Sequence, residues 1–139
     1  FTLQLAQVYG DRGLAKAMFS APDRSLRSLP PDATADFNRA LQLNPKDERT
    51  YYNRGCMRHR WGDNTGAIAD FSQAIALEPR HAFAYMQRGI LRGLGGDTPG
   101  AIADLRQAMT YLCNSGDATA CQQARALMQQ LRGVGSTIS

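Results

Sequence analysis

The sequence predicts an all-α fold made of stacked helical hairpins. Residues 53–74 and 87–108 carry the same pattern of arginine, glycine, alanine and aspartate, 34 positions apart. A fixed period of this length indicates stacked supersecondary units rather than a single closed core. Apolar residues recur at helical spacing along nearly the whole chain, and no stretch shows the alternation of a β-strand. We therefore expect a solenoid of helices.

The composition of the 139-residue chain fits one domain or a short array of repeats. No apolar run reaches the roughly 18 residues of a membrane-spanning helix. The net charge of +4 comes almost entirely from arginine, which suits acidic partners but is too small to predict nucleic-acid binding. The chain begins at Phe1 rather than Met, so we expect it to be processed, and removal of a signal peptide stays open.

Residues 1–47 are predicted to form an irregular first repeat. The spacing of a helix and its following turn is seen in Leu5, Ala6, Tyr9 and Gly13. The spacing of a second helix is seen in Asp36, Phe37, Ala40 and Pro45. In the following repeat, Gly62 precedes Phe71 by nine residues. Gly13 precedes Phe37 by 24 residues, which predicts an insertion of about 15 residues near 14–31.

The predicted insertion contains three prolines and so cannot be one continuous helix. We expect an extra helical turn over 14–20 and a loop over 21–31. The loop could be a tolerated surface insertion, or it could contact a partner through Met18, Phe19, Arg24 and Arg27. In a second interpretation, 1–20 is a separate helix that packs on the end of the solenoid.

Further helices are predicted over 64–77, 98–112 and 117–132, each with its apolar residues on one face. Gly-Asp pairs lie in the turns, where glycine favours the end of one helix and aspartate caps the next. The predicted units are a repeat at 48–81, a repeat at 82–116, a C-terminal capping helix at 117–133 and a flexible tail at 134–139. The capping helix has a polar outer face, formed by Gln122, Gln123, Gln129, Gln130 and Arg132.

The central copies resemble the tetratricopeptide repeat, a helix–turn–helix of 34 residues. Its slots hold Tyr51, Arg54, Gly55, Arg58, Ala67, Phe71, Ala74 and Pro79 in one copy, and Tyr85, Arg88, Gly89, Arg92, Ala101, Leu105, Ala108 and Cys113 in the other. Arginine replaces the usual leucine and tyrosine in both copies, and the second copy lacks the final proline. The resemblance implies a right-handed α-α superhelix of about three repeats plus the capping helix.

The residues on which the two copies agree are assigned to the scaffold. Small residues at Gly55, Gly89, Ala67 and Ala101 let the two helices of a repeat approach closely. Arg54 lies 16 residues before Asp70, and Arg88 lies at the same distance before Asp104. We predict one ion pair between the helices of each repeat, with a structural role.

The resemblance also implies a concave face, lined by first helices, that binds a peptide or protein segment. The inward slots are Leu3, Gln4 and Gln7 in the first repeat, and then Arg49, Tyr52, Asn53, Cys56, His59, Arg60, Phe83, Met86, Gln87, Ile90 and Leu94. This predicted groove is basic at one end and apolar at the other, which would suit a ligand with acidic and apolar segments. Alternatively, Phe83 and Ile90 pack under a neighbouring helix.

One subtype of the family grips a C-terminal carboxylate with five basic or amide side chains. Asn53 matches one of these slots, whereas Leu3, Gln7, Phe83 and Gln87 occupy the others. The sequence therefore argues against this subtype.

Cys113 and Cys121 flank a predicted turn, and the hairpin could bring their Cα atoms within reach of a disulfide. Their spacing resembles that of Sel1-like repeats at this one turn. Two reduced thiols are the alternative, and Cys56 has no evident partner. A disulfide would indicate a periplasmic or extracellular protein, and reduced thiols a cytoplasmic one.

No catalytic, phosphate-binding or zinc motif occurs, and His59 and His81 are far apart in the repeat scheme. We expect no enzyme activity, no cofactor and no metal. The first candidate function is a peptide- or protein-binding adaptor. The second is a structural module whose repeat ends stack into homo-oligomers or filaments. RNA binding is a weaker third candidate, since it depends only on the arginine cluster.

Overall fold

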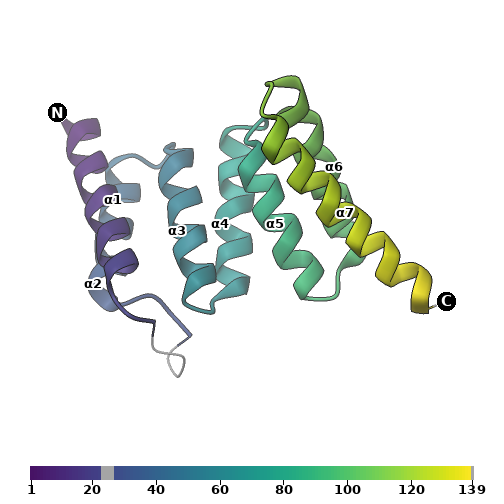
Figure 1. The fold of residues 1–139 in the computed structure, drawn as a ribbon. Coiled ribbons are helices and arrows are strands. Elements are labelled where there is room, and N and C mark those ends of the chain that lie inside the picture. The colour runs from purple at the N-terminus through teal and green to yellow at the C-terminus, as the bar shows by residue number, and fades with distance from the viewer. Residues whose placement is uncertain (23–26, 139) are drawn as a thin grey trace. The chain divides into compact units, whose positions relative to one another are not determined.

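The computed structural model describes residues 1–22 and 27–138, and this part of the chain is all α-helical (Figure 1). The helices are α1 (Thr2–Phe19), α2 (Pro31–Leu43), α3 (Glu48–Arg60), α4 (Asn64–Leu77), α5 (Ala82–Leu94), α6 (Thr98–Asn114) and α7 (Ala118–Ile138). The strongly paired helices are α1 with α2, α3 with α4, α5 with α6 and α6 with α7, each pair forming an antiparallel hairpin, which confirms the predicted fold class. None of the described helices is long and apolar enough to cross a membrane.

The chain divides into two compact units, Phe1–Leu77 and Glu78–Ser139. The first unit contains the hairpins α1–α2 and α3–α4, and α3 also contacts α1 and α2. Phe37 and Phe71 are almost fully buried, each under the first helix of its hairpin. The side chain of Trp61, at the end of α3, fills the space between the hairpins and donates a hydrogen bond from Nε1 to the Ala17 carbonyl at 3.2 Å. Its buried neighbours are Ala17, Leu29, Ala33 and Phe37.

The first hairpin has a shorter insertion than the sequence analysis predicted. Gly13 packs against Phe37 in the way that Gly55 packs against Phe71, so Gly13 corresponds to Gly55 and not to Gly62. The predicted insertion of about 15 residues is therefore wrong. Compared with the hairpin α3–α4, the first hairpin has eight additional residues, and they lie in the connection from α1 to α2. Arg24 and its neighbours at 23–26 lie outside the described residues.

Residues 14–19 continue α1 as regular helix, as expected for most of 14–20. After this helix the backbone extends, and Leu29 returns to cover Trp61. Met18 and Phe19 are exposed at the end of α1, with 42% and 86% of their surface accessible. The close pairing of α1 with α2 favours a first-repeat hairpin over a separate helix.

The second unit contains α5, α6 and α7, and its core lies where these three helices meet. The buried residues are Met86, Leu105, Ala108, Leu112, Ala120, Cys121, Ala124 and Met128. The last helix was predicted to end at 133, whereas α7 reaches Ile138. Gly133 and Gly135 weaken a helix by about 1 kcal/mol each but do not block one, as a proline would.

One turn structure recurs before α4, α6 and α7. Gly62, Gly96 and Gly116 have φ values of +87°, +90° and +85°, which L side chains rarely adopt. The aspartate after each glycine accepts a hydrogen bond from the backbone N–H three residues on, at 2.8, 3.0 and 3.1 Å. The Gly-Asp pair thus ends one helix and starts the next in all three places.

Candidate partner-binding faces

A buried aspartate holds the two helices of each central hairpin together. Asp70 accepts hydrogen bonds from Nε and Nη2 of Arg54 at 2.9 and 2.7 Å, and from Nη1 of Arg58 at 2.9 Å. Only 3% of the Asp70 side chain is exposed. Because a buried carboxylate needs such partners, the cluster fixes α3 against α4.

The hairpin α5–α6 contains the same cluster. Arg88 donates to Asp104 from Nε and Nη2 at 2.9 and 2.8 Å, and Arg92 donates from Nη1 at 2.9 Å. The structure therefore brings together both arginine–aspartate pairs that the sequence predicts. It adds Arg58 and Arg92, which occupy the slot of the usual tyrosine and were not assigned a partner. A tyrosine ring lies about one helical turn before each first arginine, with its centroid 5.6 Å from the guanidinium carbon in both hairpins.

A third cluster, which the sequence analysis missed, lies in the first hairpin. Arg12 binds Asp36 from Nε and Nη2 at 2.7 and 2.8 Å, and Lys16 adds an ion pair at 3.0 Å. The hydrogen bond from Arg12 lowers the pKa of the Asp36 carboxyl, against the opposite effect of burial. Tyr9 stacks on Arg12 at 5.2 Å. The signal was the recurrence of Tyr-x-x-Arg-Gly at 9–13, 51–55 and 85–89.

A polar pocket of about 250 Å³ lies between α1 and α3 in the first unit. It is lined by Leu3, Gln7, Gly10, Asp11, Asn44, Asp47, Arg49, Thr50 and Asn53. Four of these, Leu3, Gln7, Arg49 and Asn53, were predicted to face inward. Arg49 lies 3.9 Å from Asp11, and both side chains are more than half exposed, so this ion pair is weak. The Arg49 guanidinium can therefore exchange this contact for another carboxylate.

The remaining predicted residues of α3 lie in different surroundings. Tyr52 packs on the Phe71 ring at a centroid distance of 5.7 Å and is half-buried. Cys56 is half-buried too, and burial raises the pKa of its thiol. His59 Nδ1 lies 3.0 Å from the Asn64 side-chain oxygen, and Arg60 is exposed. The exposed Arg49 and Arg60 are thus the basic groups of α3 that a partner can reach most easily.

The predicted residues of α5 differ in exposure. Phe83 is 40% exposed, Gln87 and Ile90 are half-buried, and Met86 is buried at 7% in the core of the second unit. Met86 packs against α6 and α7, so most of its side chain is buried and only a small part of it can line the predicted groove. A pocket beside it is lined by Met86, Gln87, Ile90, Gln123, Ala126 and Leu127.

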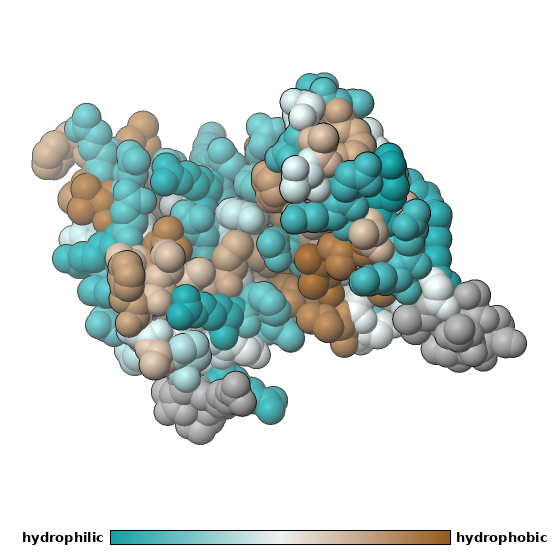
Figure 2. All heavy atoms as spheres, viewed as in Figure 1, coloured by the Kyte–Doolittle hydropathy of each residue, from teal (hydrophilic) through white to brown (hydrophobic). Residues whose placement is uncertain are grey.

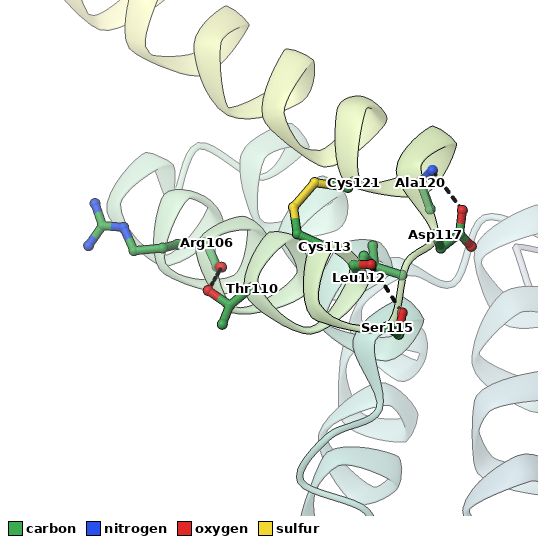
Figure 3. Close-up of a disulfide and its surroundings, with 8 residues drawn as sticks. All are labelled: Arg106, Thr110, Leu112, Cys113, Ser115, Asp117, Ala120 and Cys121. Atoms are coloured by element: carbon green, nitrogen blue, oxygen red, sulfur yellow. Dashed lines mark hydrogen bonds between the residues drawn. A yellow bond between two sulfur atoms is a disulfide. The ribbon is translucent and has the colours of Figure 1, made fainter.

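The structure joins Cys113 and Cys121 in a disulfide between the last turn of α6 and the first turn of α7 (Figure 3). Their Cα atoms are 5.2 Å apart. The connection is also held by the Asp117 cap and by a hydrogen bond of 3.0 Å from the Ser115 hydroxyl to the Leu112 carbonyl. The Sel1-like character of this turn, and the compartment that the disulfide would indicate, stay predictions. The described residues contain no group of three metal-binding side chains.

Residues 48–81 match the family model described as tetratricopeptide repeat, over the same range as the predicted repeat. The chain therefore contains a tetratricopeptide repeat at these residues and has the fold of a tetratricopeptide-repeat scaffold. This scaffold typically has no catalytic activity. No curated protein matches the sequence closely enough to serve as a relative.

Solved tetratricopeptide-repeat structures share the fold of this chain at low sequence identity. The TPR2B domain of yeast Sti1, in its pHsp70 complex, has a TM-score of 0.74 at 19% identity and covers 95% of this chain and 97% of its own. The first TPR of Spaghetti (RPAP3), bound to the HSP90 peptide SRMEEVD, has a TM-score of 0.71 at 20% identity, covering 93% and 94%. PcrH, in complex with the chaperone-binding region of PopD, has a TM-score of 0.77 at 16% identity, covering 96% and 93%.

Proposed function

We propose that this chain is an interaction module that binds peptide or protein segments on the first-helix faces of its hairpins. The observation that carries the proposal is the pocket between α1 and α3, which is lined by predicted inward residues from two successive hairpins. Complexes of similar proteins with peptides and with a translocator segment support it. The scaffold residues are excluded from this role, because their charges are already paired inside the hairpins.

The proposed ligand chemistry follows from the exposed side chains of each face. Arg49 and Arg60 on α3 offer positive charge with little competition from internal acids, which suits acidic residues of a partner. Phe83 and Ile90 on α5 offer apolar contact, with Gln87 beside them for hydrogen bonds. Tyr52, Asn53, Cys56 and His59 complete the proposed face of α3, and Met86 forms part of the floor beside Ile90.

A random 12-residue peptide library displayed on phage and panned against the chain tests this function. Enriched peptides are then labelled, and their dissociation constants are measured by fluorescence anisotropy. We expect Arg49→Glu and Arg60→Glu to weaken acidic peptides at least tenfold. Arg39→Glu on α2 is the matched control, because Arg39 is also exposed but lies outside the proposed face. Failure to enrich any peptide, or equal loss with all three variants, would overturn the proposal.

Self-assembly is the second candidate, and exposed apolar residues on α1 favour it. Met18 and Phe19, at the end of α1, are 42% and 86% exposed. Multi-angle light scattering over a hundredfold range of concentration separates the two functions. A monomer mass throughout eliminates self-assembly, whereas a rising mass that Phe19→Lys abolishes supports it.

A further inference from the structure

The second unit has an apolar groove between α5 and α7 that extends well beyond the residues predicted from the sequence. One pocket is lined by Met86, Gln87, Ile90, Gln123, Ala126 and Leu127. The other, with a volume of about 260 Å³, is lined by Ile90, Gly93, Leu94, Leu105, Leu127, Gln130 and Leu131. Ile90 and Leu127 line both pockets, so the two form one continuous groove. Figure 2 shows apolar surface in this region, and Leu94 is 69% exposed within it.

A single glycine opens the second pocket. Gly93 occupies the position that His59 holds in the preceding repeat. A Cβ atom on Gly93 would lie 3.3 Å from Leu131 Cδ2 and 3.6 Å from the Ala101 Cβ, so any larger side chain would project toward the pocket or its walls. The absence of a side chain here leaves Leu105, which is fully buried, as the floor.

The electrostatics of the groove define the ligand. The lining residues of both pockets carry no charged side chain, and burying a ligand charge against them would be unfavourable. The arginines of α5, Arg88 and Arg92, are bound to Asp104 in the hairpin scaffold and do not line either pocket. The polar groups at the groove are the amides of Gln87, Gln123 and Gln130, which can both donate and accept hydrogen bonds. Apolar pockets with uncharged amides suit a peptide main chain that carries uncharged side chains.

The spacing of the pockets defines the ligand further. Their lining residues shift by about one helical turn along both α5 and α7, which corresponds to about 6 Å at 1.5 Å per residue. This distance fits residues i and i+2 of an extended peptide, which are about 6.6 Å apart. It also fits residues i and i+4 of a helix. We propose that the α5–α7 groove binds a partner segment through two large, uncharged apolar side chains with one of these spacings.

This inference deepens the proposed function, and its test distinguishes the two. Peptides enriched from the random library are measured against Leu94→Lys and Ala126→Lys, which place charge in the groove at exposed positions. Val8→Lys on α1 makes the same charge change at a similarly exposed apolar position and is the control. Circular dichroism and the melting temperature verify that each variant is folded.

We expect enriched peptides to share an apolar pair at i, i+2 or i, i+4, and to bind both groove variants at least tenfold more weakly than the Val8→Lys control. Replacing either apolar residue of the peptide by serine should cause a similar loss. Peptides that bind but are insensitive to Leu94→Lys and Ala126→Lys overturn the groove and leave the proposed function standing. A library that yields no binders overturns both. If Val8→Lys weakens the peptides equally, the site lies elsewhere and the groove assignment is wrong.

Discussion

The hairpins α3–α4 and α5–α6 share one scaffold and differ on the faces of their first helices. Both contain the tyrosine–arginine stack, the arginine–aspartate cluster and the Gly-Asp turn, with distances that agree within a few tenths of an ångström. In the face positions, Arg49 is replaced by Phe83, His59 by Gly93 and Arg60 by Leu94. The residues that hold each hairpin together are thus the same in both copies, while the residues on the proposed binding faces differ.

Removal of the buried aspartate should have the largest effect and should act equally in both hairpins. Asp70→Ala and Asp104→Ala each leave two arginines without their shared carboxylate, and we expect a loss of about 3 kcal/mol in the free energy of unfolding. Urea denaturation measures this loss, with Asp32→Ala as a control at an exposed carboxylate on α2. A loss in only one hairpin would show that the two scaffolds are not equivalent.

A disulfide should be transferable from the α6–α7 hairpin to α5–α6. Gly93 and Ala101 are eight residues apart, as are Cys113 and Cys121, and a Cβ on Gly93 would lie 3.6 Å from the Ala101 Cβ. This distance suits a disulfide. We expect Gly93→Cys with Ala101→Cys to oxidise spontaneously and to add about 2 kcal/mol of stability.

Mass spectrometry and thiol titration detect the new bond, and unfolding with and without dithiothreitol measures its contribution. The single variant Gly93→Cys is the control. Two free thiols that persist under oxidising conditions would show that the turns of the two hairpins differ.

The glycine of each first helix should resist substitution by alanine. A Cβ on Gly55 would lie 2.9 Å from Phe71 Cε1, and one on Gly89 would lie 3.1 Å from the Asp104 Cβ. We expect each Gly→Ala variant to lose about 1 kcal/mol, because overpacking outweighs the helix propensity that alanine gains. At Gly133 an added Cβ would meet no atom of the described residues within 4 Å, so Gly133→Ala should not be destabilised in thermal melts. Stabilisation at Gly55 or Gly89 would contradict the close-packing account.

The first hairpin provides a smaller, pH-dependent contrast. The pKa of Asp36 in the folded chain is lowered by the Arg12 hydrogen bond, so the carboxylate stabilises the fold above its unfolded pKa of about 3.9. This contribution is lost as pH falls through the folded pKa. We expect Asp36→Asn to lower the melting temperature at pH 7, and to have a progressively smaller effect as the pH falls below about 3.9 and then through the folded pKa. An effect that stays constant across this range would show that the charge of Asp36 is unimportant.

The sequence predicted the fold because the two regular repeats carry the same small residues at the same positions, and helical packing leaves few alternatives for such a pattern. It misjudged the first hairpin because Gly13 was aligned with a turn glycine, although Gly13 is a packing glycine like Gly55. That misalignment also concealed Arg12 and Lys16 as partners of Asp36.

The proposed faces were harder to predict than the scaffold. The exposure of the α5 side chains depends on their contacts with α7. The repeat pattern does not predict these contacts, because α7 lies outside the two regular repeats. Met86 is therefore buried, while Leu94 is exposed. Trp61 was missed because its partners, Ala17 and Leu29, lie far away in the sequence.

The most direct test of the account converts the face of α5 into that of α3. The double variant Phe83→Arg, Leu94→Arg copies the residues at 49 and 60 and leaves every scaffold residue in place. Melting temperature and the anisotropy of peptides enriched on the unmodified chain are measured together. We predict an unchanged melting temperature, within the small effects typical of surface substitutions, and at least a tenfold weaker binding of apolar peptides. A lower melting temperature with unchanged peptide binding would contradict the separation of scaffold from binding face.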